Sequence, residues 1–146
     1  MTKYILDTDH LSLIQRKGIE GQLILAKIST LDNPEIAVTV ITYEEQIRGR
    51  LLYLAKAKSI EQQVKAYSGL QQLITDYRSI PIIPFDRTAV LEYQRLRRQY
   101  SRLGKMDLKI AAITLTNDAV LVTRNEGDFA QIAELKWENW SKILSE

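Results

Sequence analysis

Short apolar runs that alternate with helix-length segments limit this sequence to few folds. The runs occupy residues 4–6, 35–41, 80–84 and 119–123. The segments between them carry apolar residues at three- and four-residue steps, which is typical of amphipathic helices. Strands that alternate with helices form a mostly parallel sheet with helices packed on it. We therefore expect an α/β sandwich with a central sheet of four to five strands, built as one domain over residues 1–146.

Turn and capping residues predict where these elements begin and end. The expected strands are residues 3–7, 35–41, 80–84 and 119–123, and the prolines of the third place it at an edge of the sheet or lie at the ends of the strand. A short helix follows Thr8 and breaks at Gly18, and a second covers residues 19–30. Asp86 caps a helix over residues 87–103, which Gly104 stops, and Asp107 begins the next helix.

Two long helices between the second and third strands are expected to form an αα-hairpin. The first begins at Thr42, and the joint lies near Lys58 and Ser59. The second helix carries an apolar stripe that either packs on the sheet or meets a second copy of the chain. The stripe consists of Ile60, Val64, Tyr67, Leu70, Ile74 and Tyr77.

Carboxylates follow the apolar runs, at the edge of the sheet where α/β proteins bind ligands. Asp7 and Asp9 end the first strand, and Asp107 opens a later helix. Asn125 and Asp128 come directly after the last apolar run. Each has a simpler explanation as well: Asp7, Asp9 and Asp128 are possible helix caps, Asp107 complements a helix dipole, and Asn125 suits a left-handed turn.

Carboxylates gathered at one edge would repel one another unless a proton or a cation relieved the repulsion. The chain has no cysteine, and its single histidine, His10, is expected to be structural or to support the site from behind. This composition excludes thiolate metal sites and His-rich zinc sites. Oxygen ligands alone favour Mg²⁺, with Mn²⁺ as its substitute, and Mg²⁺ typically meets phosphate. The implied reaction is hydrolysis of a phosphate ester by metal-activated water.

The sequence resembles the PIN-domain ribonucleases and, among them, the VapC-type toxins of toxin–antitoxin pairs. The resemblance spans nearly the whole chain and rests on motifs in the expected order. They are ILDTD at residues 5–9, VITYEEQ at 40–46 with Gly49 just after, MDLKIAA at 106–112, LVTRNEGDF at 121–129 and the closing LKWENW at 135–140.

The resemblance implies roles for individual residues. Asp7 and Asp107 match the two central metal-binding acids of the family, and Glu45, rather than Glu44, matches its helix glutamate. Either Asn125 or Asp128 completes the acidic set, and an asparagine there leaves one negative charge fewer. The expected catalytic residues are therefore Asp7, Glu45, Asp107 and Asp128, supported by Thr8, Thr123 and Asn125.

The resemblance further implies a PIN-like fold and a Mg²⁺-dependent endoribonuclease that acts as a toxin. It implies a homodimer built partly on the αα-hairpin and a cognate antitoxin that occupies the site. A basic helix just before Asp107 fits contact with RNA phosphates or with an acidic antitoxin segment. The residues singled out are Arg95, Arg98, Arg102 and Lys105.

Two other functions fit parts of the sequence. A phosphatase of the haloacid dehalogenase type also opens with a strand into Asp-x-Asp, but the chain lacks room for that family's lysine motif between Thr123 and Asp128. A catalytically silent binding module would use the acids as caps and the hairpin as a docking surface. The sequence shows neither a basic-then-apolar leader nor a membrane-length apolar run, so we expect a soluble cytoplasmic protein with no membrane partner.

Overall fold

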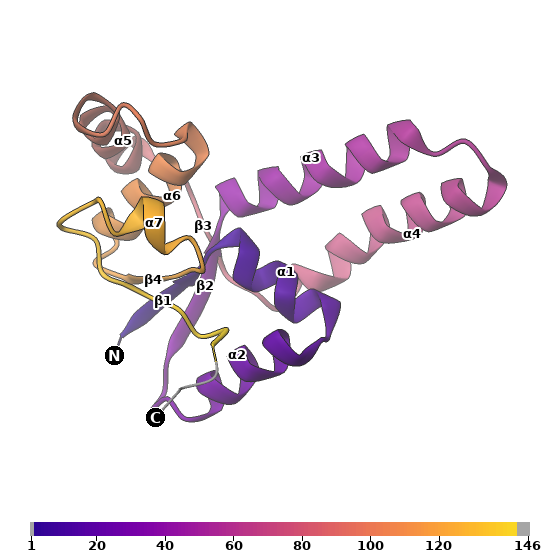
Figure 1. The fold of residues 1–146 in the computed structure, drawn as a ribbon, viewed down its shortest axis with the longest axis horizontal. Helices are drawn as coiled ribbons and strands as arrows, with labels where there is room; N and C mark the ends of the chain where they lie inside the picture. Colours follow the sequence, from indigo (N-terminus) through magenta and orange to yellow (C-terminus); the bar gives the residue numbers. More distant parts are fainter. Residues whose placement is uncertain (1, 143–146) are drawn as a thin grey trace.

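Five parallel strands form one sheet at the centre of residues 2–142, the part of the chain that the computed structural model describes (Figure 1). The strands lie in the order β3-β2-β1-β4-β5, so β1 is central and β3 is at an edge, as predicted. Every neighbouring pair is parallel. Their bounds are β1 (Lys3–Leu6), β2 (Glu35–Thr39), β3 (Ile82–Ile83), β4 (Val120–Val122) and β5 (Trp137–Glu138).

Helices cover both faces of the sheet, and the pleat of the central strand separates two cores. Ile5 of β1 belongs to the core beneath α5, α6 and α7, whereas the next residue, Leu6, belongs to the core beneath α1 and α2. The α/β/α sandwich is thereby confirmed. The helices are α1 (Thr8–Arg16), α2 (Ile19–Ser29), α3 (Val40–Lys56), α4 (Ile60–Asp76), α5 (Arg87–Gln99), α6 (Lys105–Thr116) and α7 (Glu126–Phe129).

Some predicted boundaries were wrong. The second strand ends at Thr39 rather than residue 41, and α3 begins before Thr42, because the Thr39 hydroxyl accepts a hydrogen bond from the Thr42 amide and caps the helix. The fifth helix ends at Gln99 instead of near residue 103, since Tyr100 leaves the helical region at φ −121° and ψ 54°. Gly104 is the N-cap of α6 rather than the stop of α5.

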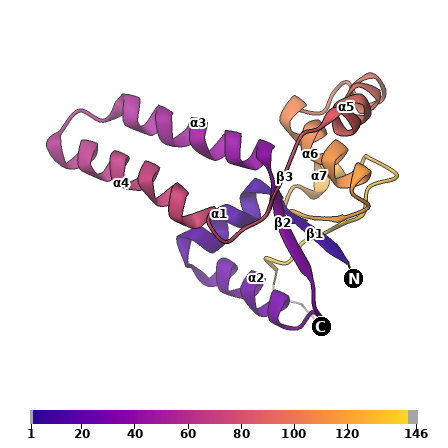
Figure 2. The same ribbon diagram turned by 180° about the vertical axis from the view of Figure 1, so that it is seen from behind.

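The αα-hairpin of α3 and α4 extends from the sheet as a long arm (Figures 1 and 2). Ser59 caps α4 with a capping box, in which the Gln62 amide donates to the Ser59 hydroxyl and the Ser59 amide donates to the Gln62 side-chain oxygen. Of the α4 stripe, Tyr77 packs against the core beneath α1 and α2, so the alternative of packing on the sheet holds at that end of the stripe. Helix α4 also buries Ala66 and Leu73, and most of the stripe faces outward. No helix of the described residues is long and apolar enough to span a membrane.

Helices α1 and α2 pack so closely that only glycine fits at their contact. A Cβ atom on Gly21 would lie 2.3 Å from the carbonyl oxygen of Leu13, whereas a Cβ on Gly49 would meet nothing within 4 Å.

We expect Gly21→Ala to lower the free energy of unfolding by about 1–3 kcal/mol, because backbone must move to admit the methyl group. Gly49→Ala, in the exposed interior of α3, should raise it by about 0.5–1 kcal/mol by restricting the unfolded chain. Urea unfolding of both variants measures the difference, and equal effects would contradict the close packing of α1 on α2.

Candidate active site

The candidate acids gather where β1 and β4 end, at the carboxyl edge of the sheet. The amide of Asp7 donates to the carbonyl of Val122 at 2.8 Å, which continues the parallel pairing one residue past β1. The hydroxyl of Thr123 then donates to Asp7 Oδ2 at 2.8 Å. Strand pairing therefore brings together two side chains from opposite ends of the sequence.

Asp7 is buried at this edge, with 5% of its surface exposed. Its Oδ1 accepts from the Thr8 amide at 2.9 Å, so Asp7 also caps α1. The pKa of its carboxyl is raised to about 7, chiefly by burial and then by the charge of Asp9, against the lowering effect of the hydrogen bonds from Thr123 and Thr8. Asp7 therefore both caps α1 and belongs to the acidic site.

Asp107 lies in the first turn of α6 and is partly buried. The pKa of its carboxyl is raised to about 6. Burial is the largest cause, and the charges of Asp128, Glu45 and Asp9 are the next causes. These three neighbours come from α7, α3 and α1, so Asp107 lies within the electrostatic field of acids from separate elements. The pKa of Asp7 is in turn raised by Asp107.

The two consecutive glutamates of α3 point in different directions. Thr8 Oγ1 donates to Glu45 Oε1 at 2.6 Å, which holds Glu45 beside the start of α1. Glu44 instead pairs with Arg48 at 2.6 Å on the exposed surface. Thr8, a predicted supporting residue, also lies 3.0 Å from the Thr42 hydroxyl and so ties α1 to α3.

Asn125 joins the acids rather than making a turn. Its backbone, at φ −83°, is not left-handed, so that explanation was wrong. The side-chain nitrogen Nδ2 of Asn125 donates to Asp107 Oδ2 at 3.2 Å and to Asp128 Oδ2 at 3.1 Å. Asp128 lies within α7 and does not cap it. Asn125 thus separates two carboxylates with a neutral donor.

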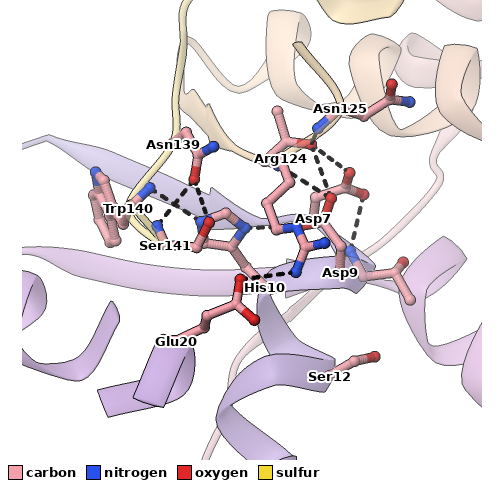
Figure 3. A network of polar contacts seen from close by, with 12 residues as sticks. Asp7, Asp9, His10, Ser12, Glu20, Arg124, Asn125, Asn139, Trp140 and Ser141 are labelled. Atoms are coloured by element: carbon pink, nitrogen blue, oxygen red, sulfur yellow. Dashed lines mark hydrogen bonds and ion pairs between the residues drawn. The ribbon is translucent and has the colours of Figure 1, made fainter. Parts of the chain in front are cut away.

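Sequence reasoning missed the role of Asp9. Its carboxylate lies 2.7 Å from the ring of His10 and accepts from the Arg124 amide at 3.1 Å (Figure 3). The available signal was the spacing of two residues from Asp7 together with the neighbouring histidine. Asp9 is neither a cap nor a freely solvated acid.

The four predicted basic residues differ in whether side chains of the same chain engage them. Arg95 is engaged by Glu92 and by Glu134, the latter at 3.0 Å, and by Gln99. The carboxylates take up its charge, so Arg95 is a structural link between α5 and the segment after α7. Arg98, Arg102 and Lys105 remain exposed.

The donor chemistry of the site fits a hard divalent cation. Asp7 and Asp107 offer carboxylate oxygens, and each has a raised pKa that a nearby cation would lower. Within residues 2–142, no ion pair engages Asp7, Glu45, Asp107 or Asp128. Among those same residues, no three His, Asp or Glu side chains form a group that is ready to hold a metal ion. Two protein carboxylates with solvent or phosphate oxygens are nonetheless a usual ligand set for Mg²⁺.

The sequence is similar to a known protein family and to relatives named as a ribonuclease. The sequence matches the model of the family described as PIN domain over residues 4–135. It is 28% identical over 144 residues to Ribonuclease VapC1 of Haemophilus influenzae strain R2866, covering 95% of this chain and 98% of that protein.

The fold is similar to solved toxin–antitoxin complexes. One is VapBC2 from Rickettsia felis bound to a DNA fragment from their promoter, with a TM-score of 0.71, 26% identity and coverage of 95% of this chain and 99% of that one. Another is VapBC-1 from nontypeable Haemophilus influenzae, with a TM-score of 0.71, 26% identity and coverage of 97% and 100%.

The raised pKa of Asp7 predicts a pH-dependent stability in metal-free protein. The folded state keeps a proton on Asp7 up to about pH 7, whereas the ordinary pKa of an aspartate, as in an unfolded chain, is 3.8. Between these values the folded state binds more protons, so the free energy of unfolding falls as pH rises. Asp7→Asn stays neutral and should raise the free energy of unfolding at pH 8 by on the order of 4 kcal/mol.

Urea unfolding in EDTA between pH 4 and pH 8 measures this effect. Asp32→Asn, which removes the same charge from an exposed turn, serves as the control. An Asp7→Asn variant with the pH slope and stability of the control would contradict the burial of Asp7.

Proposed function

The chain belongs to the PIN-domain family, and we propose that Asp7 and Asp107 form the metal-binding centre of its nuclease site. Its homologues are ribonucleases, and the protein is a VapC-type ribonuclease, the toxin of a toxin–antitoxin pair. Such an enzyme hydrolyses phosphodiester bonds of RNA. The match to the PIN-domain family argues against a phosphatase of the haloacid dehalogenase type. The similarity of the chain to named ribonucleases argues against a catalytically silent binding module.

One observation carries the assignment of the site: Asp7 and Asp107 belong to one electrostatic cluster. They lie on different elements, the pKa of each is raised, and Asp107 is among the causes of the rise at Asp7. PIN-domain ribonucleases are generally metal-dependent, and we assign Mg²⁺ here, with Mn²⁺ as substitute, because the donors are oxygens. When bound, such an ion acts as a Lewis acid and lowers the pKa of water.

The protein's own residues fix the geometry for that chemistry. Thr123 and the Thr8 amide hold the two oxygens of Asp7, and Asn125 holds one oxygen of Asp107. Thr8 also fixes Glu45 through Oε1, which leaves the second oxygen to accept the proton of an attacking water. Asp128, linked to Asn125, completes the acidic rim. We assign Asp7, Glu45, Asp107 and Asp128 as catalytic, with Thr8, Thr123 and Asn125 in support.

Substrate binding is assigned to exposed basic residues between the last turn of α5 and the start of α6. Arg98 lies in the last turn of α5, Arg102 follows that helix, and Lys105 is the first residue of α6, two residues before Asp107. Such charges neutralise RNA phosphates, and the binding they give weakens as salt rises. Arg95 is left out because its acidic neighbours occupy it. An enzyme acting on cellular RNA belongs in the cytoplasm, with a cognate antitoxin to restrain it.

Metal binding and RNA cleavage should depend together on Asp107. We expect Asp107→Asn to abolish saturable Mn²⁺ binding in calorimetry and to lower RNA cleavage by more than roughly 100-fold, because one charged ligand is replaced by a neutral one.

Asp7→Ala should abolish cleavage while leaving a folded protein. Glu44→Gln is the matched control, since Glu44 lies on the same helix as Glu45 but pairs with Arg48. Mn²⁺ binding unchanged in Asp107→Asn would rule out the proposed centre.

We propose that a second copy of the chain covers the outward face of the hairpin. The exposed fractions are 77% for Ile60, 66% for Val64, 58% for Tyr67 and 64% for Ile74, and all four lie on α4. Apolar side chains aligned on one helix face and turned to solvent are typical of an association surface.

We expect the wild type to sediment as a dimer of its 16.8 kDa chain and Val64→Glu to sediment as a monomer at micromolar concentration. The reason is that association would bury the new carboxylate without a partner. Leu25→Glu, which alters a 51% exposed apolar residue of α2, should remain dimeric. A monomeric wild type, or a Val64→Glu variant that stays dimeric, would contradict the proposal.

A further inference from the structure

The only histidine of the chain is completely buried between the acidic site and the C-terminal segment. His10 Nδ1 lies 2.7 Å from Asp9 Oδ1, and His10 Nε2 lies 3.1 Å from the amide nitrogen of Trp140 (Figure 3). Both ring nitrogens therefore have partners. Asp9 is one residue from His10 in the sequence, and Trp140 is 130 residues from it.

The partners determine which nitrogen carries the proton. A backbone amide can only donate, so Nε2 must accept and carries no hydrogen. The hydrogen is then on Nδ1, where it is donated to the Asp9 carboxylate. A neutral ring that uses both nitrogens in this way orients its partners.

Asp9, held by His10, contacts the loop after β4 through its second oxygen. Its Oδ2 accepts from the Arg124 amide at 3.1 Å and lies 3.3 Å from Thr123 Oγ1. Thr123 Oγ1 also donates to Asp7 and accepts from the Asn125 amide at 3.0 Å. The loop held by Asp9 thus carries the hydroxyl that positions Asp7 and the amide side chain that positions Asp107.

The C-terminal segment holds the same loop from the other side. The Thr123 amide donates to the carbonyl of Glu138 at 2.8 Å, and the Asn139 side chain donates to Glu126 at 3.3 Å. Asn139 Oδ1 also accepts from the amide and the hydroxyl of Ser141, which closes the turn around Trp140. Trp140 itself is buried against the ring of Tyr4, with ring centroids 5.0 Å apart.

We propose that Asp9 and His10 are positioning residues that couple the docked segment 139–141 to the metal-binding geometry of Asp7 and Asp107. This inference rests on the proposed function, because it concerns the same acids. Without the hydrogen of His10 Nδ1, Asp9 Oδ1 loses its donor and the carboxylate no longer fixes residues 123–125. The affinity for the metal then falls although none of its assigned ligands has changed.

Two conservative substitutions divide the functions of the ring. The amide of His10→Asn reaches the place of Nδ1 and can still donate to Asp9, whereas the amide of His10→Gln reaches the place of Nε2 and can still accept from Trp140. We expect His10→Gln to weaken Mn²⁺ binding by roughly tenfold in calorimetry and His10→Asn to restore most of it. Trp140 fluorescence in a Trp137→Phe background, where Trp140 is the only tryptophan, should remain like that of the parent in His10→Gln and shift in His10→Asn.

Asn139→Ala tests the same coupling without touching the ring. It opens the turn around Trp140 and should weaken Mn²⁺ binding in the same direction as His10→Gln. Unchanged Mn²⁺ affinity in both His10→Gln and Asn139→Ala, with the wild type binding and Asp107→Asn not binding, would overturn this inference alone. A wild type that binds no Mn²⁺ would overturn the proposed metal centre and this inference with it.

Discussion

The hydroxyl of Thr123 joins the two ends of the chain in one acidic site. It donates to Asp7 from the end of β4, 116 residues away, and accepts from the amide of Asn125. A hydroxyl has one hydrogen to donate, and both Asp7 and Asp9 lie within reach of it. The geometry of the site therefore depends on which carboxylate receives that hydrogen, and the shorter distance favours Asp7.

Neutral donors, rather than cations, hold these acids in place. Hydroxyl, amide and ring N–H groups contact Asp7, Glu45, Asp107 and Asp9, and the arginine and lysine ion pairs in the described part of the chain are made with other acids. Neutral donors orient a carboxylate without cancelling its charge. Burial and, after it, the repulsion that remains raise the pKa values of Asp7 and Asp107. A site built in this way keeps its negative charge for a divalent ion and its substrate phosphate.

The sequence pattern predicted what depends on the strands, and it failed where distant loops meet. The place of Asp7 follows from a buried strand that ends in an acid, and the edge position of β3 follows from its prolines. The contact of Arg95 with Glu134 joins residues 39 positions apart and has no local signal. The roles of Asp9 and Asn125 depend on how residues 123–125 fold back onto the acids, which propensity alone does not determine. The fifth strand is two residues long, too short for any periodic pattern.

Association and chemistry are assigned to different parts of the fold, and they meet at Thr8. The hairpin of α3 and α4 carries the exposed apolar face, while Asp7, Asp107 and Asp128 all belong to the body around the sheet. Glu45 is the one assigned acid on the hairpin, and it reaches the body through its 2.6 Å hydrogen bond with Thr8. Thr8 directly follows Asp7 and donates its amide to it. Any partner that moves α3 relative to the sheet therefore acts on the acidic site through this contact, since Thr8 holds acids from both parts.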